Sequence, residues 1–220
     1  MRIIAAFLAS LLFLTAAFAQ NEQAPIVERD IEYKDWTYKS IRGGDEINLR
    51  SFAAGKKLVI VVYFAPWCPN WRHDAPMLQR LYDKYRSAGL EIVAVGEYDP
   101  VDAMKTNLDA LKLTFPAVYE SQNRTEKTNT LHFGYRRLTG DNRNWGSPWY
   151  LFVTPTVIEK KGDVLLRKAS VINGEMIEDE GEKFIREKLG LPPQTRVAVA
   201  RKETVEVCDP NAKPAALRKP

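Results

Sequence analysis

The chain has 220 residues, 45% of them hydrophobic and 27% charged, which is enough for one globular domain with short appendages. Arg2 contributes +1 to the net charge of +4, and residues 191–220, with six basic and three acidic side chains, contribute +3. The segment between them is therefore neutral and carries no dense basic patch, which excludes a nucleic-acid-binding domain. The two cysteines, Cys68 and Cys208, are too few for a disulfide-scaffolded fold.

The first residues are typical of an export signal. Arg2 precedes an apolar run over residues 3–18, and Ala17-Phe18-Ala19 has the small-x-small pattern of a cleavage site. This arrangement predicts a signal peptide at residues 1–19, cleaved after Ala19. The alternative is an uncleaved membrane anchor, since the run is at the short end of the ~17–25 residues that span a bilayer. We therefore expect an exported protein, located in a bacterial periplasm.

Residues 20–32 are polar and are expected to be irregular. Next, residues 36–38 and 47–49 alternate apolar with polar residues around Gly43-Gly44, a pattern that predicts a β-hairpin. The continuous apolar, β-branched run at residues 58–64 predicts a central strand buried on both faces.

Helical and strand patterns alternate over the next part of the chain. Residues 74–88 have apolar side chains at helical spacing, and Gly89 follows as a C-cap. A second buried strand is predicted at residues 91–95, a second helix at 101–113 and a short strand at 115–119. These segments form the β-α-β-α-β order that implies parallel strands.

The last part of the chain predicts an antiparallel pair and a closing helix. Residues 121–146 are polar, with periodicity only near 131–138, and residues 149–153 form an apolar strand after Pro148. Residues 164–166 are its expected hairpin partner, and a helix is predicted at residues 175–189. The fold class is therefore α/β, with a mixed central sheet and helices on both faces.

The most informative motif follows the first buried strand. It reads Phe64-Ala65-Pro66-Trp67-Cys68-Pro69-Asn70-Trp71, and Asp74, Pro76 and Leu78 follow it. From about Trp36 to Leu189 the chain resembles the TlpA-like redoxins, exported members of the thioredoxin superfamily with the pattern F-x-A-x-W-C-x-x-C-x-x-E-x-P-x-L. The resemblance implies a thioredoxin-like three-layer sandwich over residues 20–190, followed by a basic, proline-rich flexible tail at residues 191–220.

The chain departs from that pattern at two positions. Trp71 stands where the family has its second cysteine, and Asp74 stands where it has glutamate. The resemblance also implies a cis-proline facing the active-site cysteine. Pro148 and Pro155 compete for that place, and Pro148 is favoured because a proline can open a strand but not sit inside a central one.

Cys68 is the predicted catalytic residue. It lies where a strand turns into a helix, and the amides and dipole of a helix N-terminus stabilise a thiolate. Such a site lowers a thiol pKa from ~8.5 into the range of ~3.5–7.5. The alternative is an inert, partly buried cysteine.

Three residues near Cys68 are candidates for substrate binding: Trp67, Trp71 and Pro148. The side chain of Trp71 either forms a lid or stacking surface for a substrate or only packs in the core. In neither case can Trp71 resolve a mixed disulfide.

Two further residues are candidates for catalysis. The resemblance to the TlpA-like redoxins implies that Asp74 is the proton acceptor behind the active-site turn. The alternative is a solvated acid near a helix N-terminus, stabilised by the helix dipole. Cys208, 140 residues after Cys68, either resolves a disulfide with Cys68, pairs with another chain or stays a free thiol. Arg72 and His73 are expected to be exposed helix residues.

The sequence predicts neither a metal site nor a cofactor. Its two histidines and two cysteines are scattered, and no phosphate-binding loop is present. The predicted function is a thiol-disulfide oxidoreductase with a single active-site cysteine, acting on a protein thiol or disulfide client or an external thiol reductant. The alternatives are a non-catalytic binding module on the same fold and a one-cysteine peroxidase-like enzyme.

Overall fold

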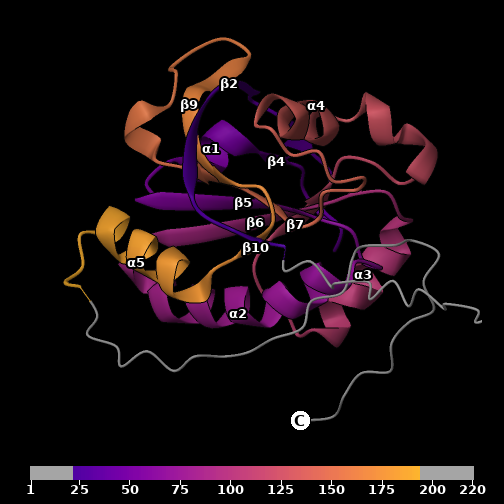
Figure 1. Ribbon diagram of the computed structural model, residues 1–220, viewed down its shortest axis with the longest axis horizontal. Helices are drawn as coiled ribbons and strands as arrows, with labels where there is room; N and C mark the ends of the chain where they lie inside the picture. The colour runs from indigo at the N-terminus through magenta and orange to yellow at the C-terminus, as the bar shows by residue number, and fades with distance from the viewer. Residues whose placement is uncertain (1–21, 194–220) are drawn as a thin grey trace, which may run out of the picture.

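A six-stranded mixed sheet forms the centre of the molecule in this computed structural model, which describes residues 22–193 (Figure 1). The strand order is β2-β9-β8-β5-β6-β7. The bounds are β2 (Val27–Lys34), β9 (Val164–Ile172), β8 (Trp149–Val153), β5 (Leu58–Phe64), β6 (Leu90–Gly96) and β7 (Ala117–Tyr119). Strands β5, β6 and β7 are parallel, whereas β8 is antiparallel to both β5 and β9, and β9 to β2. The predicted mixed sheet is confirmed.

Strand β5 occupies a central place because of its sequence. All seven of its residues are apolar or aromatic, and all are buried, as expected of a strand covered on both faces. Its C-terminal end leads directly into the turn that carries Cys68. The position of Cys68 is therefore fixed by the most buried strand of the domain.

Helices cover both faces of the sheet (Figure 1). The three helices α2 (Pro69–Tyr85), α3 (Val101–Ala110) and α5 (Glu178–Leu189) pack on one face, and α1 (Leu49–Ala53) and α4 (Leu131–Leu138) on the other. Leu78 and Ile185 belong to the buried cluster on the first face, and Leu49 and Tyr135 to the cluster on the second. The domain is thus the three-layer sandwich that the sequence predicted.

Short elements complete the domain. A parallel pair joins β1 (Gln23–Ala24) to β10 (Glu175–Met176), and β3 (Thr37–Tyr38) pairs with β4 (Ile47–Asn48) in the predicted hairpin. Gly43 and Gly44, between β3 and β4, both have positive φ, which glycine adopts without a steric penalty. Three 3-10 turns are η1 (Arg86–Ala88), η2 (Arg124–Asn129) and η3 (Pro155–Val157).

The structure differs from the predicted elements in several places. Helix α2 begins at Pro69 and not at residue 74, β9 extends to Ile172, and α1 was not predicted. Residues 27–32 were expected to be irregular, but they belong to the edge strand β2, whose first half is exposed. Only Ile31 and Tyr33 of β2 are buried, so its alternation is too short to stand out in the sequence. The last helix was predicted from residue 175, but Glu175 and Met176 pair with β1, and α5 begins at Glu178.

The predicted signal peptide and nearly all of the predicted tail, including Cys208, lie outside the described residues. Within residues 22–193, no helix has the length and apolar character needed to cross a membrane.

Candidate active site

Cys68 lies at the N-cap of α2, directly after the turn that follows β5. Pro69 takes the first helical position, where a missing N–H costs no helical hydrogen bond. The N–H of Cys68 donates to the carbonyl oxygen of Ala65 at 3.0 Å, which closes the turn. Cys68 therefore lies between a strand and the N-terminus of a helix, and its side chain makes no capping hydrogen bond to the first-turn amides of α2.

A second segment, Ser147-Pro148, lies against the sulfur of Cys68. The Ser147–Pro148 peptide bond is cis, whereas Pro155, the competing candidate, begins η3. The carbonyl oxygen of Ser147 lies 3.1 Å from Cys68 Sγ, and Ser147 Oγ accepts a hydrogen bond from the N–H of Ala65 at 2.9 Å. Ser147 thus contacts the active-site turn at two points, the N–H of Ala65 and the sulfur of Cys68.

Cys68 is fully buried and disulfide-bonded, and free cysteines are absent from the described part of the chain. In this oxidised form the sulfur carries no proton, so its approach to the carbonyl oxygen of Ser147 at 3.1 Å is a close contact and not a donated hydrogen bond.

Trp71 is buried in the core. Its ring stacks on Phe64 with centroids 4.6 Å apart, and its Nε1–H donates to Asn107 Oδ1 at 2.9 Å. Asn107, from α3, also donates to the carbonyl oxygen of Pro66 at 3.2 Å. Of the two roles considered for Trp71, packing is the one that these contacts support.

Asp74 is buried on α2, six residues after Cys68, and is not the solvated acid that the sequence also allowed. Its Oδ2 accepts hydrogen bonds from Tyr150 Oη at 2.5 Å and from the backbone N–H of Met176 at 2.9 Å. Burial raises the pKa of Asp74 above its usual value. Although aspartate is shorter than the glutamate of the family pattern, the Asp74 carboxylate therefore reaches buried partners behind the active-site turn.

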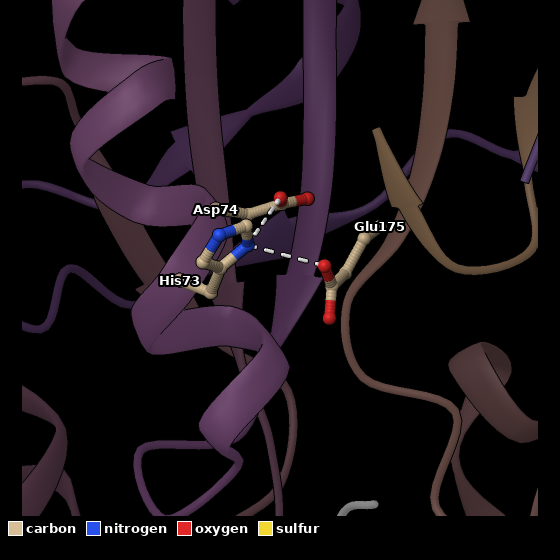
Figure 2. A group of neighbouring side chains, drawn as sticks. All are labelled: His73, Asp74 and Glu175. Atoms are coloured by element: carbon tan, nitrogen blue, oxygen red, sulfur yellow. Dashed lines mark hydrogen bonds and ion pairs between the residues drawn. The ribbon is translucent and has the colours of Figure 1, made fainter. Parts of the chain in front are cut away.

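His73 and Glu175 lie beside Asp74, and Figure 2 shows both carboxylates turned toward the imidazole. The His73 Nδ1 atom is 3.1 Å from Glu175 Oε2 and 3.8 Å from Asp74 Oδ1. These two carboxylates raise the pKa of His73 to about 10. The His73 side chain is 44% exposed, whereas Glu175 is fully buried. Sequence reasoning missed Glu175, because it was placed inside the last helix.

A buried polar network joins the N-terminus of α2 to the cis-proline segment. Arg143 donates to the carbonyl oxygen of Pro148 at 2.9 Å, to Glu22 Oε2 at 2.7 Å and to both carboxylate oxygens of Asp141. Asn70, within the active-site motif, donates to the same Glu22 oxygen at 2.5 Å. Sequence reasoning missed Arg143, which lies in the segment 121–146 that was described only as polar.

Aromatic and cationic side chains border the turn. Trp67, which precedes Cys68, is partly exposed and packs edge-on against Trp145, with ring centroids 5.3 Å apart. Arg124 lies 5.3 Å from the Trp67 ring centroid, and Lys127 lies 4.6 Å from that of Trp145. This rim combines flat apolar surface with positive charge.

Comparison with protein families and curated proteins points to redox proteins. The profile of the AhpC/TSA family matches residues 29–133. Thiol-disulfide oxidoreductase ResA of Halalkalibacterium halodurans is 30% identical over 77 residues, which are 35% of this chain and 43% of that protein. ResA of Bacillus thuringiensis is 24% identical over 143 residues, which are 65% of this chain and 69% of that protein. The chain thus spans less than half of the first relative.

Solved structures show the same fold. A thiol:disulfide interchange protein of the thioredoxin family from Chlorobium tepidum superposes with a TM-score of 0.53 and 18% identity. The superposition covers 74% of this chain and 98% of that structure. At this identity the likeness shows the fold alone, and it agrees with the three-layer arrangement described above.

Proposed function

We propose that this chain, which belongs to the thioredoxin superfamily and is related to the ResA thiol-disulfide oxidoreductases, exchanges disulfides through one active-site cysteine, Cys68. One observation carries the proposal: Cys68 Sγ lies at the N-terminus of α2 and 3.1 Å from the carbonyl oxygen that precedes the cis bond to Pro148. A sulfur in this place combines thiolate-stabilising amides with an adjacent backbone segment that can position a client chain.

The exchange proceeds in two balanced steps. The thiolate of reduced Cys68 attacks one sulfur of a client disulfide, which forms a mixed disulfide and releases the other client sulfur as a thiolate. The thiolate of Cys208 then attacks the Cys68 sulfur, which forms a Cys68–Cys208 disulfide and releases the first client sulfur. An external dithiol reductant returns both cysteines to the thiol form. The exchange requires no metal or cofactor.

Cys208 is the proposed resolving cysteine because Trp71 offers no sulfur. Cys68 is disulfide-bonded, and the chain contains one other cysteine, which supports this pairing. Non-reducing peptide mapping of the purified full chain tests it. We expect one peptide pair joined through Cys68 and Cys208, which the Cys208→Ser variant lacks. Recovery of both thiols free after oxidative export would contradict the resolving role.

The roles of the neighbouring residues follow from their contacts. Asp74 is the proposed proton acceptor, since its buried carboxylate has a raised pKa and can take up a proton at the back of the turn. Trp67 and Pro148 are the proposed contacts for a client, because Trp67 is partly exposed beside Cys68 and Pro148 follows the carbonyl that touches its sulfur.

A binding module is the second candidate function. The observation in its favour is that Trp71 fully occupies the place of the second cysteine, packed on Phe64 and hydrogen-bonded to Asn107. A binding module would hold a client with equal affinity after Cys68→Ser, whereas an oxidoreductase would lose all exchange. Turnover of hydrogen peroxide by the reduced chain would instead favour the one-cysteine peroxidase.

We also propose that the protein is exported to a bacterial periplasm with residues 1–19 removed. The support is the sequence of the N-terminus, together with the redox chemistry proposed for Cys68, which suits an oxidising compartment. N-terminal sequencing of the protein from fractionated cells tests this proposal. A mature chain beginning at Gln20 in the periplasmic fraction is expected, and a full-length chain in the membrane fraction would indicate an anchor instead.

A further inference from the structure

Three side chains of different chemistry converge beside the active-site helix. His73 and Asp74 come from α2, and Glu175 comes from β10, so the cluster joins segments 101 or more residues apart in the chain. One nitrogen or oxygen atom from each side chain lies within 4.8 Å of the other two. Figure 2 shows the imidazole between the two carboxylates. We propose that these residues bind a divalent transition-metal ion of the Zn²⁺ class.

The ligand types and spacings suit such an ion. One imidazole nitrogen with two carboxylate oxygens is a common donor set for Zn²⁺ and similar ions. With metal–ligand bonds of about 2.0–2.2 Å, tetrahedral neighbours lie about 3.2–3.6 Å apart. The observed separations from His73 Nδ1 are 3.1 Å to Glu175 Oε2 and 3.8 Å to Asp74 Oδ1. The two carboxylate oxygens lie within 4.8 Å of each other, so the side chains of Asp74 and Glu175 would close on a bound ion by up to roughly 1.5 Å.

A second observation concerns the other oxygen of Glu175. Its Oε1 is buried and has no hydrogen-bond partner among the described residues. A buried, unpaired carboxylate oxygen is costly, so native structures usually satisfy it. The backbone of Glu175 is held in β10 by a 2.9 Å hydrogen bond from its N–H to the carbonyl oxygen of Glu22. Bidentate coordination of a metal ion would give Oε1 its missing partner.

Asp74 is already oriented for coordination. Its Oδ2 accepts hydrogen bonds from Tyr150 and from the N–H of Met176, and Oδ1 remains on the side of His73. Hydrogen bonds of this kind hold a metal-ligating carboxylate in place and tune its basicity. His73 is partly exposed, which provides an entry route for the ion.

The net charge of the cluster favours a bound divalent metal ion over an ion pair between a protonated His73 and the two carboxylates. An imidazolium between two carboxylates leaves the cluster with a charge of −1 at a largely buried place. A divalent ion with neutral His73, Asp74 and Glu175 leaves it with none.

This inference does not depend on the proposed thiol exchange, and its test uses metal alone. Isothermal titration of the oxidised full chain with Zn²⁺, and absorbance titration with Co²⁺, are expected to show one saturable site. The Co²⁺ spectrum should lack a thiolate charge-transfer band, and binding should persist in the Cys68→Ser/Cys208→Ser double variant. Both results would show that neither cysteine is a ligand of the metal ion.

Substitutions locate the site. Glu175→Gln and His73→Gln, each checked for folding by circular dichroism, are expected to weaken binding at least about tenfold. The matched control is Glu178→Gln, because Glu178 pairs with Arg80 at 3.0 Å outside the cluster; its affinity should be unchanged. The absence of saturable binding, or binding that survives both cluster substitutions in folded protein, would overturn the proposal and leave an ion pair only.

Discussion

The carbonyl oxygen of Ser147 lies 3.1 Å from the sulfur of Cys68. The same serine accepts a hydrogen bond from the backbone of Ala65 through its hydroxyl, so two segments 82 residues apart meet around one sulfur. The position of Ser147 therefore determines which atoms surround the sulfur of Cys68, and substitutions can test the residues that hold Ser147 in place.

Ser147→Ala tests the support on the turn. The substitution removes the acceptor for the buried N–H of Ala65, and an unsatisfied buried donor costs about 1–3 kcal/mol. We expect the free energy of unfolding of the oxidised protein, measured in urea, to fall by about that amount. Ser51→Ala, at an exposed position of α1, is the control and should change little. Equal stability of Ser147→Ala and wild type would mean that the hydroxyl does not support the turn.

Trp71→Ala distinguishes packing from substrate stacking. Trp71 is fully buried, and truncation of such a side chain costs about 3–5 kcal/mol. We expect this loss in urea unfolding, with client affinity of the folded protein largely retained. The matched variant is Trp67→Ala, whose partly exposed ring should contribute less to stability and more to client binding. The reverse pattern would make Trp71 the stacking surface.

Arg143→Gln tests the polar network behind Pro148. The substitution leaves the carboxylates of Asp141 and Glu22 without their shared partner, and breaking a buried ion pair costs about 3–5 kcal/mol. Since Arg143 is 19% exposed, we expect the lower end of that range in urea unfolding. Arg137→Gln, at an exposed position of α4, is the control. A similar small loss in both variants would show that the network adds nothing beyond surface charge.

The ion pair of His73 makes stability depend on pH. Its pKa is raised to about 10, above the value of about 6.5 expected in the unfolded chain, so the native state binds the proton more tightly. The stabilisation is therefore complete below about pH 6.5 and is lost as the pH rises through about 10. Because the side chain is half-exposed, the contribution stays below about 1 kcal/mol.

We expect His73→Gln to be less stable than wild type near neutral pH and equally stable above about pH 10. Urea unfolding across this range, with a chelator present to exclude metal ions, measures the difference. A difference that did not change with pH would show that the imidazolium contributes nothing.

Much of the architecture was predictable from local patterns. The apolar run of β5 indicated the strand, and the motif around Cys68 indicated the turn, whereas α2 begins at Pro69, five residues before the predicted start. The apolar strand after Pro148 also favoured that proline over Pro155 as the cis residue, and the structure agrees. These features are local, because each depends on the spacing of neighbouring residues.

What the sequence could not provide depends on distant contacts. The packing of Trp71 requires Asn107 on another helix, and the burial of Asp74 requires Tyr150 from β8. Glu175 followed a helical pattern but pairs with β1, which brings it to His73. No local pattern encodes such encounters, so the cluster became visible only in the fold.

The central claim is that Cys68 performs the exchange and that Cys208 resolves it. Mass spectrometry of the reduced chain after rapid mixing with a disulfide-bonded peptide tests it most directly. The account predicts that Cys208→Ser accumulates a mixed disulfide at Cys68, whereas wild type releases the peptide thiol and forms an internal disulfide. Failure of Cys68 to form any adduct, or equal accumulation in wild type and Cys208→Ser, would contradict it.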